Sequence, residues 1–222
     1  MNYIIGCGGV GGWLAQLMCK LVKPANITLI DGDTIEERNI ERQLFSDDDI
    51  GENKATTLAR RLKCQANPGW YSEFMFQHGE HDWLLCCVDN NPARASALSA
   101  CDRFGCRAII GANEVHSSEA YVYHPDWDGM ETLDPRQYYP ELSQDRSGNR
   151  MAISAGCTGE EQEKNVQLAT ANFMAAALMS HLYVVWAMEA RKVKRESHAY
   201  MPNRLVQNLT RSSFTLRGEI KP

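Results

Sequence analysis

The chain has 222 residues, 44% of them hydrophobic, so it can bury a sizeable core, and we expect one α/β domain over residues 1–222. Its 28 acidic and 23 basic residues give a net charge of −5 at pH 7, and no block of Lys and Arg offers a surface for nucleic acid. No secretory leader precedes the first apolar run, and the most apolar stretch, residues 173–188, is shorter than the roughly 20 residues that span a bilayer, so we expect a cytoplasmic protein without a membrane partner.

A short apolar run, a glycine-rich turn and a helix-like stretch open the chain. Residues 3–5 predict a strand, and residues 13–22 carry apolar side chains at helical spacing. Between them lies Gly6-Cys7-Gly8-Gly9-Val10-Gly11-Gly12. Such a turn lets backbone N–H groups approach an anion, and the helix N-terminus adds partial positive charge. We therefore expect a nucleotide phosphate to bind at Gly6, Gly8, Gly9 and Gly11.

Strands and helices are predicted to alternate through the first half of the chain. Apolar runs at residues 27–30 and 71–76 predict strands, and residues 53–65 between them predict a helix. Asp31 follows the first of these strands, twenty residues after Gly11, where a carboxylate can accept hydrogen bonds from ribose hydroxyls. This spacing suits either ATP or a nicotinamide dinucleotide.

The next predicted strand, at residues 83–88, is almost wholly apolar, as expected of a central parallel strand buried on both faces. Asp89 closes it, and Pro92 is placed to open a helix. Further strands are predicted at residues 107–111 and 120–123. Together these elements predict a doubly wound, Rossmann-like, mostly parallel sheet with helices on both faces.

The character of the sequence changes after about residue 125. Residues 125–160 contain several prolines, glycines and aspartates without sustained periodicity, which predicts a long loop. Residues 161–192 predict a helix, because apolar side chains recur there at helical spacing. In residues 204–220, apolar and polar side chains alternate enough to predict a C-terminal β-hairpin.

The eight cysteines do not resemble a disulfide framework. The chain has no Cys-x-x-Cys pair, and Cys101 and Cys106 form an isolated couple with poor spacing for a metal. We therefore expect no zinc site, and we interpret most of these cysteines as small core residues.

Several polar motifs follow the glycine-rich turn in a fixed order. They are Asp31-x-Asp33, Asn39-x-x-Arg42-Gln43, Gly51-x-x-Lys54, Asn67-Pro68 and Val88-Asp89-Asn90. With these motifs the chain resembles the ThiF, MoeB and ubiquitin-activating enzyme superfamily over roughly residues 3–120. The resemblance implies an ATP-dependent adenylyltransferase that adenylates the C-terminal glycine of a small ubiquitin-like or sulfur-carrier protein.

The resemblance also implies roles for individual residues. Asp31 would bind the ATP ribose, and Asp89 would hold Mg²⁺. The triphosphate would be surrounded by Asn39, Arg42, Gln43 and Lys54. These roles suit the chemistry, because adenylation brings a carboxylate towards a polyanion and its transition state needs added positive charge. Asp89 also has a competing role as a helix cap, and Arg42 and Lys54 have one as ordinary surface cations.

Cys157 is the candidate nucleophile. Many members of the superfamily carry a cysteine between a long loop and a helix, and it attacks the acyl-adenylate to form a thioester. Cys157 stands at that place and is followed by Thr158, as in the ubiquitin-type members. A nearby helix N-terminus would favour the thiolate, whereas the acidic residues Glu160 and Glu161 would oppose it.

Three other functions stay open at this point. The first is adenylation without a cysteine intermediate, in which the adenylate passes to a sulfur donor. The second is a nucleotide-binding interaction protein without turnover. The third is an NAD(P)-dependent oxidoreductase, against which the lack of an apparent catalytic acid argues. The resemblance further implies a homodimer and a downstream conjugating or sulfur-transfer enzyme as a partner.

Overall fold

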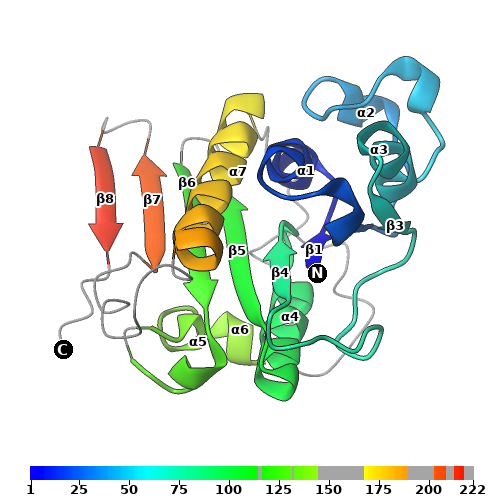
Figure 1. The fold of residues 1–222 in the computed structure, drawn as a ribbon. Helices are drawn as coiled ribbons and strands as arrows, with labels where there is room; N and C mark the ends of the chain where they lie inside the picture. The colour runs from blue at the N-terminus through cyan, green and yellow to red at the C-terminus, as the bar shows by residue number, and fades with distance from the viewer. Residues whose placement is uncertain (115–116, 132, 145–167, 190–202, 209–212, 218–222) are drawn as a thin grey trace.

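One sheet runs through the part of the chain that the computed structural model describes, which is residues 1–114, 117–131, 133–144, 168–189, 203–208 and 213–217 (Figure 1). Its strand order is β3-β2-β1-β4-β5-β6-β7-β8. The first five strands in this order are parallel, and the last three run antiparallel to their neighbours. The strands are β1 (Asn2–Ile5), β2 (Ile27–Ile30), β3 (Gln65–Asn67), β4 (Trp83–Cys86), β5 (Arg107–Asn113), β6 (Ser117–Tyr123), β7 (Arg204–Asn208) and β8 (Ser213–Arg217).

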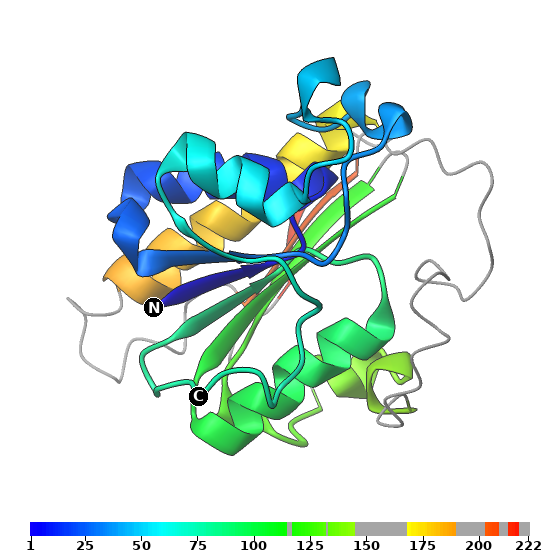
Figure 2. The same ribbon diagram turned by 90° about the vertical axis from the view of Figure 1, so that its right-hand side faces the viewer.

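Helices cover both faces of this sheet (Figure 2). One face carries α1 (Gly9–Leu21), α3 (Lys54–Leu62) and α7 (Ala169–Tyr183), and α7 continues into a π-helical turn, η5 (Val184–Glu189). The opposite face carries α4 (Asn91–Phe104), α5 (Pro135–Tyr138) and α6 (Glu141–Gln144). Short turns complete the described elements: η1 (Pro24–Asn26), α2 (Glu37–Ile40), η2 (Asp47–Asp49) and η3 (Pro125–Trp127). The predicted doubly wound α/β fold is confirmed.

The central strands are apolar on both sides because each side packs against helices. In β1, Tyr3 and Ile5 join the cluster under α4, whereas Ile4 lies in the cluster under α1 and α7. In β4, Leu84 and Leu85 divide between the two clusters in the same way. This alternation fixes the register of the strands, since a slip by one residue would exchange the two faces.

The prediction of a strand at residues 71–76 is wrong. The third strand is instead β3, a short edge strand with polar residues, and α3 ends before it at Lys63, which adopts a left-handed conformation with φ 59°. Residues 71–76 lie in turns and coil, where the ring centroid of Phe76 is 5.1 Å from that of Tyr3. Tyr71 and Phe76 pack against the cluster beneath the sheet, whereas Phe74 and Met75 are exposed, so the apolar run reflects no strand.

The second half of the chain follows the prediction in part. The C-terminal hairpin is confirmed by the antiparallel pairing of β7 with β8. The long loop is only partly irregular, because η3, α5 and α6 lie within its first twenty residues. The helix predicted at residues 161–192 is described from Ala169 onwards as α7 and η5. No helix within the described ranges is long and apolar enough to cross a membrane.

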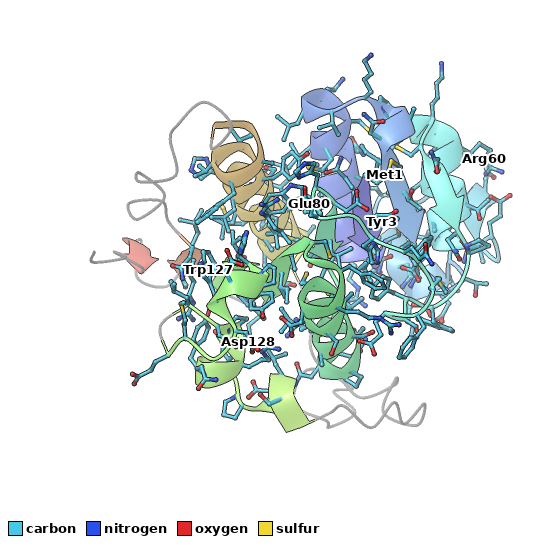
Figure 3. All side chains as sticks on the ribbon, turned by 60° about the horizontal axis from the view of Figure 1, so that its bottom comes forward. Met1, Tyr3, Arg60, Glu80, Trp127 and Asp128 are labelled. Atoms are coloured by element: carbon cyan, nitrogen blue, oxygen red, sulfur yellow. The ribbon has the colours of Figure 1, made fainter. Side chains whose placement is uncertain are left out.

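The buried side chain of Arg136 links the segment after β6 to the rest of the fold. Arg136 donates from Nε to both carboxylate oxygens of Asp134, at 2.9 and 3.1 Å, and from Nη1 to Asp102 of α4 at 2.7 Å. Its Nη2 donates to the Tyr123 hydroxyl at 2.6 Å and to Asp128 at 2.8 Å (Asp128 is labelled in Figure 3). The cation thus joins α4, β6 and α5.

We expect Arg136→Met to destabilise the protein by about 3–5 kcal/mol, because it leaves the carboxylate of Asp134, only 1% exposed, buried without its cation. Arg38→Met is the matched control, since the Arg38–Glu36 pair is 76% and 53% exposed and should contribute less than about 1 kcal/mol. Urea unfolding of the two variants measures both effects. Equal stability of the two variants would contradict the structural role of Arg136.

Candidate functional site

The candidate site lies where the carboxyl ends of β1, β2 and β4 meet. Because these strands are parallel, the glycine loop after β1, Asp31 after β2 and Asp89 after β4 come to one edge of the sheet. The strand order reverses direction at this point, since β2 and β3 lie on one side of β1 and β4 and β5 on the other. Ligands of doubly wound sheets bind at such a switch point.

The glycine loop is shaped by two close backbone contacts. Gly6 has φ +88° and donates its N–H to the carbonyl of Ile30 at 2.8 Å. A Cβ on Gly11 would lie 1.8 Å from the carbonyl oxygen of Gly6, so only glycine fits there. Helix α1 starts at Gly9, and its N-cap Gly8 supplies no side-chain hydrogen bond. The N–H groups of the first helical turn are therefore left for an anion.

Asp31 connects the loops after β1 and β2. Its Oδ2 accepts the N–H of Cys7 at 2.6 Å, and its Oδ1 accepts the N–H of Asp33 at 2.8 Å. Burial raises the pKa of the Asp31 carboxyl, while these two bonds and the nearby Lys54 oppose that rise. Burial also raises the pKa of the Cys7 thiol well above its ordinary value, so Cys7 is a core thiol and not a nucleophile.

Lys54 brings a cation to the same loops. It is the first residue of α3, it is buried, and its Nζ donates to Asp33 Oδ2 at 2.8 Å. The preceding Asn53 caps α3 by accepting the N–H of Thr56, and its amide donates to the carbonyl oxygens of Asp31 and Asp33. The start of α3 is therefore fixed against the loop after β2, with the ammonium group beside Asp31.

The motif Asn39-x-x-Arg42-Gln43 takes up three different positions. Asn39 is buried and caps the start of α2, because its Oδ1 accepts the N–H of the N-cap residue Glu36 at 3.0 Å. Gln43 lies beside the glycine loop, with its Nε2 3.7 Å from the position that a Cβ on Gly8 would occupy. The Arg42 side chain is half-buried and pairs with no carboxylate among the residues that the structure describes. Its charge is thus available for an anion.

Asn90, and not Asp89, caps helix α4, which decides between the two roles considered for Asp89. Asn90 is the N-cap of α4, since its Oδ1 accepts the N–H of Ala93 at 3.0 Å. Asp89 itself is exposed at the sheet edge. Within the described residues, no group of three or more His, Cys, Asp or Glu side chains is arranged to hold a metal ion. A cation at Asp89 would therefore need phosphate oxygens and water as further ligands.

Two residues at the site were not marked by the sequence analysis. The indole of Trp70 packs on Gly32, next to Asp31, and 52% of the Trp70 surface is exposed. Asn172 of α7 is fully buried against Gly9. A polar residue within a largely apolar helix is a signal that could have identified Asn172, whereas Trp70 lies just before the run at residues 71–76 that predicted a strand. The candidate nucleophile Cys157 lies outside the described residues.

Comparison with known proteins gives both relatives and structural neighbours. A model of the ThiF family matches residues 2–217. The mouse adenylyltransferase and sulfurtransferase MOCS3 is 30% identical over 142 residues, which cover 55% of this chain and 29% of that protein. The molybdopterin-synthase adenylyltransferase of Escherichia coli K12 is 31% identical over 109 residues, covering 44% of this chain and 43% of that protein. The chain thus spans less than half the length of either relative.

The fold is similar to that of solved E. coli proteins. MccB, in a crystal structure with ATP, superposes with a TM-score of 0.63 at 19% identity, covering 98% of this chain and 63% of that one. The tRNA N6-threonylcarbamoyladenosine dehydratase TcdA superposes with a TM-score of 0.62 at 16% identity, covering 86% and 87%. At these identities the likeness concerns the fold.

Two neighbouring glycines provide a test of the loop. We expect Gly11→Ala to destabilise the protein by about 1–3 kcal/mol, because the new Cβ would meet the Gly6 carbonyl oxygen, which is backbone and cannot turn aside. Gly12→Ala should be neutral or stabilise by up to about 1 kcal/mol, since it lies inside α1 and its Cβ would meet nothing closer than 3.7 Å. Thermal and urea unfolding measure both. If the two variants shifted stability in the same direction, the close approach at Gly11 would be refuted.

Proposed function

Because the chain belongs to the ThiF family, we propose that it binds MgATP and adenylates the C-terminal glycine carboxylate of a small ubiquitin-like or sulfur-carrier protein. One observation carries the proposal. The uncapped N-terminus of α1 and the Lys54 ammonium come from separate segments and lie at the loops that Asp31 joins, and Gln43, the neighbour of Arg42, lies beside Gly8 of the same glycine loop. This arrangement suits a polyanion attached to a ribose. The names of the two relatives, both adenylyltransferases, support the same activity.

In the proposed reaction, a carboxylate oxygen of the carrier attacks the α-phosphorus of ATP, and pyrophosphate leaves with the electron pair of the broken P–O bond. The chain's part is to bring two anions together and to stabilise the charge that develops on the phosphoryl oxygens. The N–H groups at the start of α1 donate to a phosphate. Arg42, which pairs with no carboxylate among the described residues, supplies a positive charge. Lys54 has three N–H donors and gives one to Asp33, so two are left for phosphate oxygens.

Asp89 is the proposed protein ligand of Mg²⁺. Magnesium commonly binds through one or two carboxylates together with substrate phosphates and water, and an exposed carboxylate at the end of β4 fits that pattern. When bound, the ion would neutralise part of the triphosphate charge. Asp31 is already engaged with two backbone N–H groups, and we propose that its remaining lone pairs accept the ribose hydroxyls.

A second step at Cys157 is the finer part of the proposal. Its thiolate would attack the carbonyl carbon of the acyl-adenylate, so that a C–S bond forms, the C–O bond to the phosphate breaks and AMP leaves. The alternative is that the adenylate passes directly to a sulfur donor. The homodimer and the downstream enzyme expected from the sequence also remain proposals.

Arg42→Ala should lower the rate of carrier-dependent ATP–pyrophosphate exchange by about 100-fold, because it removes a cation that stabilises the transition state. Arg38→Ala is the matched control, as Arg38 lies on the same segment but is exposed and paired with Glu36, and its rate should stay within about twofold of wild type. A suitable carrier is a small protein that ends in Gly-Gly and is encoded beside this chain. Wild-type protein that binds no MgATP, or that binds NAD⁺ instead, would refute the proposed activity.

Cys157→Ala should abolish a thiol-sensitive adduct between the chain and the carrier, while pyrophosphate exchange continues. Cys157→Ser should give an adduct that resists thiols, since an oxygen ester replaces the thioester. Gel electrophoresis with and without dithiothreitol separates these cases. A thioester that persists in Cys157→Ala would exclude this residue, and exchange without any adduct in wild type would favour direct sulfur transfer.

A further inference from the structure

Asn172 is a buried polar residue with an unpaired donor. It is 0% exposed, on the face of α7 that packs on α1 and the sheet. Its Oδ1 accepts the Nδ2 N–H of Asn113 at 3.0 Å, but its own Nδ2 has no hydrogen-bond partner among the described residues. An unsatisfied buried donor lowers the stability of the folded protein by roughly 1–3 kcal/mol, so the presence of one here needs a physical explanation.

The unpaired Nδ2 is directed at the glycine loop. A Cβ on Gly9 would lie 2.3 Å from this nitrogen and 2.6 Å from Asn172 Cγ, so the amide occupies the space that a side chain at Gly9 would need. Gly9 is the first residue of α1, whose N-cap provides no side-chain bond. Asn172 therefore adds a side-chain N–H to the place where the uncapped N–H groups of α1 converge.

Asn113 and Ser118 hold Asn172 in this position. Asn113 is the last residue of β5, so it lies at the same edge of the sheet as the glycine loop, and its amide fixes the orientation of Asn172 through the bond to Oδ1. The Ser118 hydroxyl of β6 donates to the carbonyl of Ala171 at 2.9 Å and anchors the first turn of α7. The bond from Asn113 engages Oδ1 and leaves Nδ2 as the amide atom nearest to Gly9, and the Ser118 contact holds the backbone of that turn.

We propose that Asn172 is a nucleotide-binding residue whose Nδ2 donates to a phosphate oxygen of the bound nucleotide, beside the N–H groups of α1. The inference deepens the proposed function and rests on it. Another orphan polar atom beside the loop, Gln43 Oε1, is an acceptor and so cannot serve an anion in this way. Since Nδ2 is covered in the free protein, Gly8 and Gly9 must shift to admit the phosphate, which their lack of side chains makes easy.

Asn172→Asp tests the proposal, because it keeps the shape of the side chain and replaces the donor by a negatively charged acceptor. We expect the dissociation constant for MgATP, measured by calorimetry on the full chain, to rise by about 10- to 100-fold or more, as for loss of a hydrogen bond to a charged group. Asn172→Ala removes the donor without adding charge and should weaken binding by at least about 10-fold. Thermal unfolding checks that each variant is folded. If Asn172→Asp does not fold, the binding measurement on Asn172→Ala tests the proposal.

Asn2→Asp is the matched control. Asn2 is also buried, and it also has one amide atom without a partner among the described residues, in its case Oδ1. It lies at the opposite end of β1 from the glycine loop. Its substitution should disturb the fold to a similar degree and leave MgATP binding unchanged. Folded Asn172 variants that bind MgATP within twofold of wild type would overturn the role of Asn172 alone. Wild-type protein that binds no MgATP would instead overturn the proposed function, and this inference with it.

Discussion

The carboxylate of Asp31 joins the two loops from which the candidate site is built. It accepts the Cys7 N–H after β1 and the Asp33 N–H after β2, and it is buried while doing so. A buried carboxylate without such bonds would be strongly unfavourable, so the two loops and the side chain depend on one another. Through this contact Asp31 sets the position of the glycine loop, and therefore the direction in which the N-terminus of α1 points.

The proposed site combines positively charged side chains with neutral N–H donors. Lys54 is held by Asp33, and the start of α1 contributes aligned N–H groups. Arg42 pairs with no carboxylate in the described part of the chain. Asn172 approaches from α7 with a neutral donor. Each group alone is common on protein surfaces, and in the proposed function they would together lower the repulsion between an anionic carboxylate and a triphosphate.

The sequence predicted most of the fold because its signals were local. Short, largely apolar runs marked β1, β2, β4 and β5, and the glycine spacing marked the turn before α1. The same kind of signal failed at residues 71–76, where Tyr71 and Phe76 pack beneath the sheet without joining it and Phe74 and Met75 are exposed. It also missed β3, since a three-residue edge strand with polar side chains has no periodicity to detect. Whether Asp89 or Asn90 capped α4 could not be decided locally, because either side chain can cap a helix that opens with proline.

By itself, the sequence determined the alternation of strands and helices, the glycine turn, and the order of Asp31, Asn39, Arg42, Gln43 and Lys54 along the chain. Only the tertiary structure decided which of these residues meet and what faces them from elsewhere. The contact of Asn172 with Gly9 and of Trp70 with Gly32 joins segments far apart in the chain. Such contacts depend on how helices and loops pack on the finished sheet, and packing between distant segments leaves no trace in local spacing.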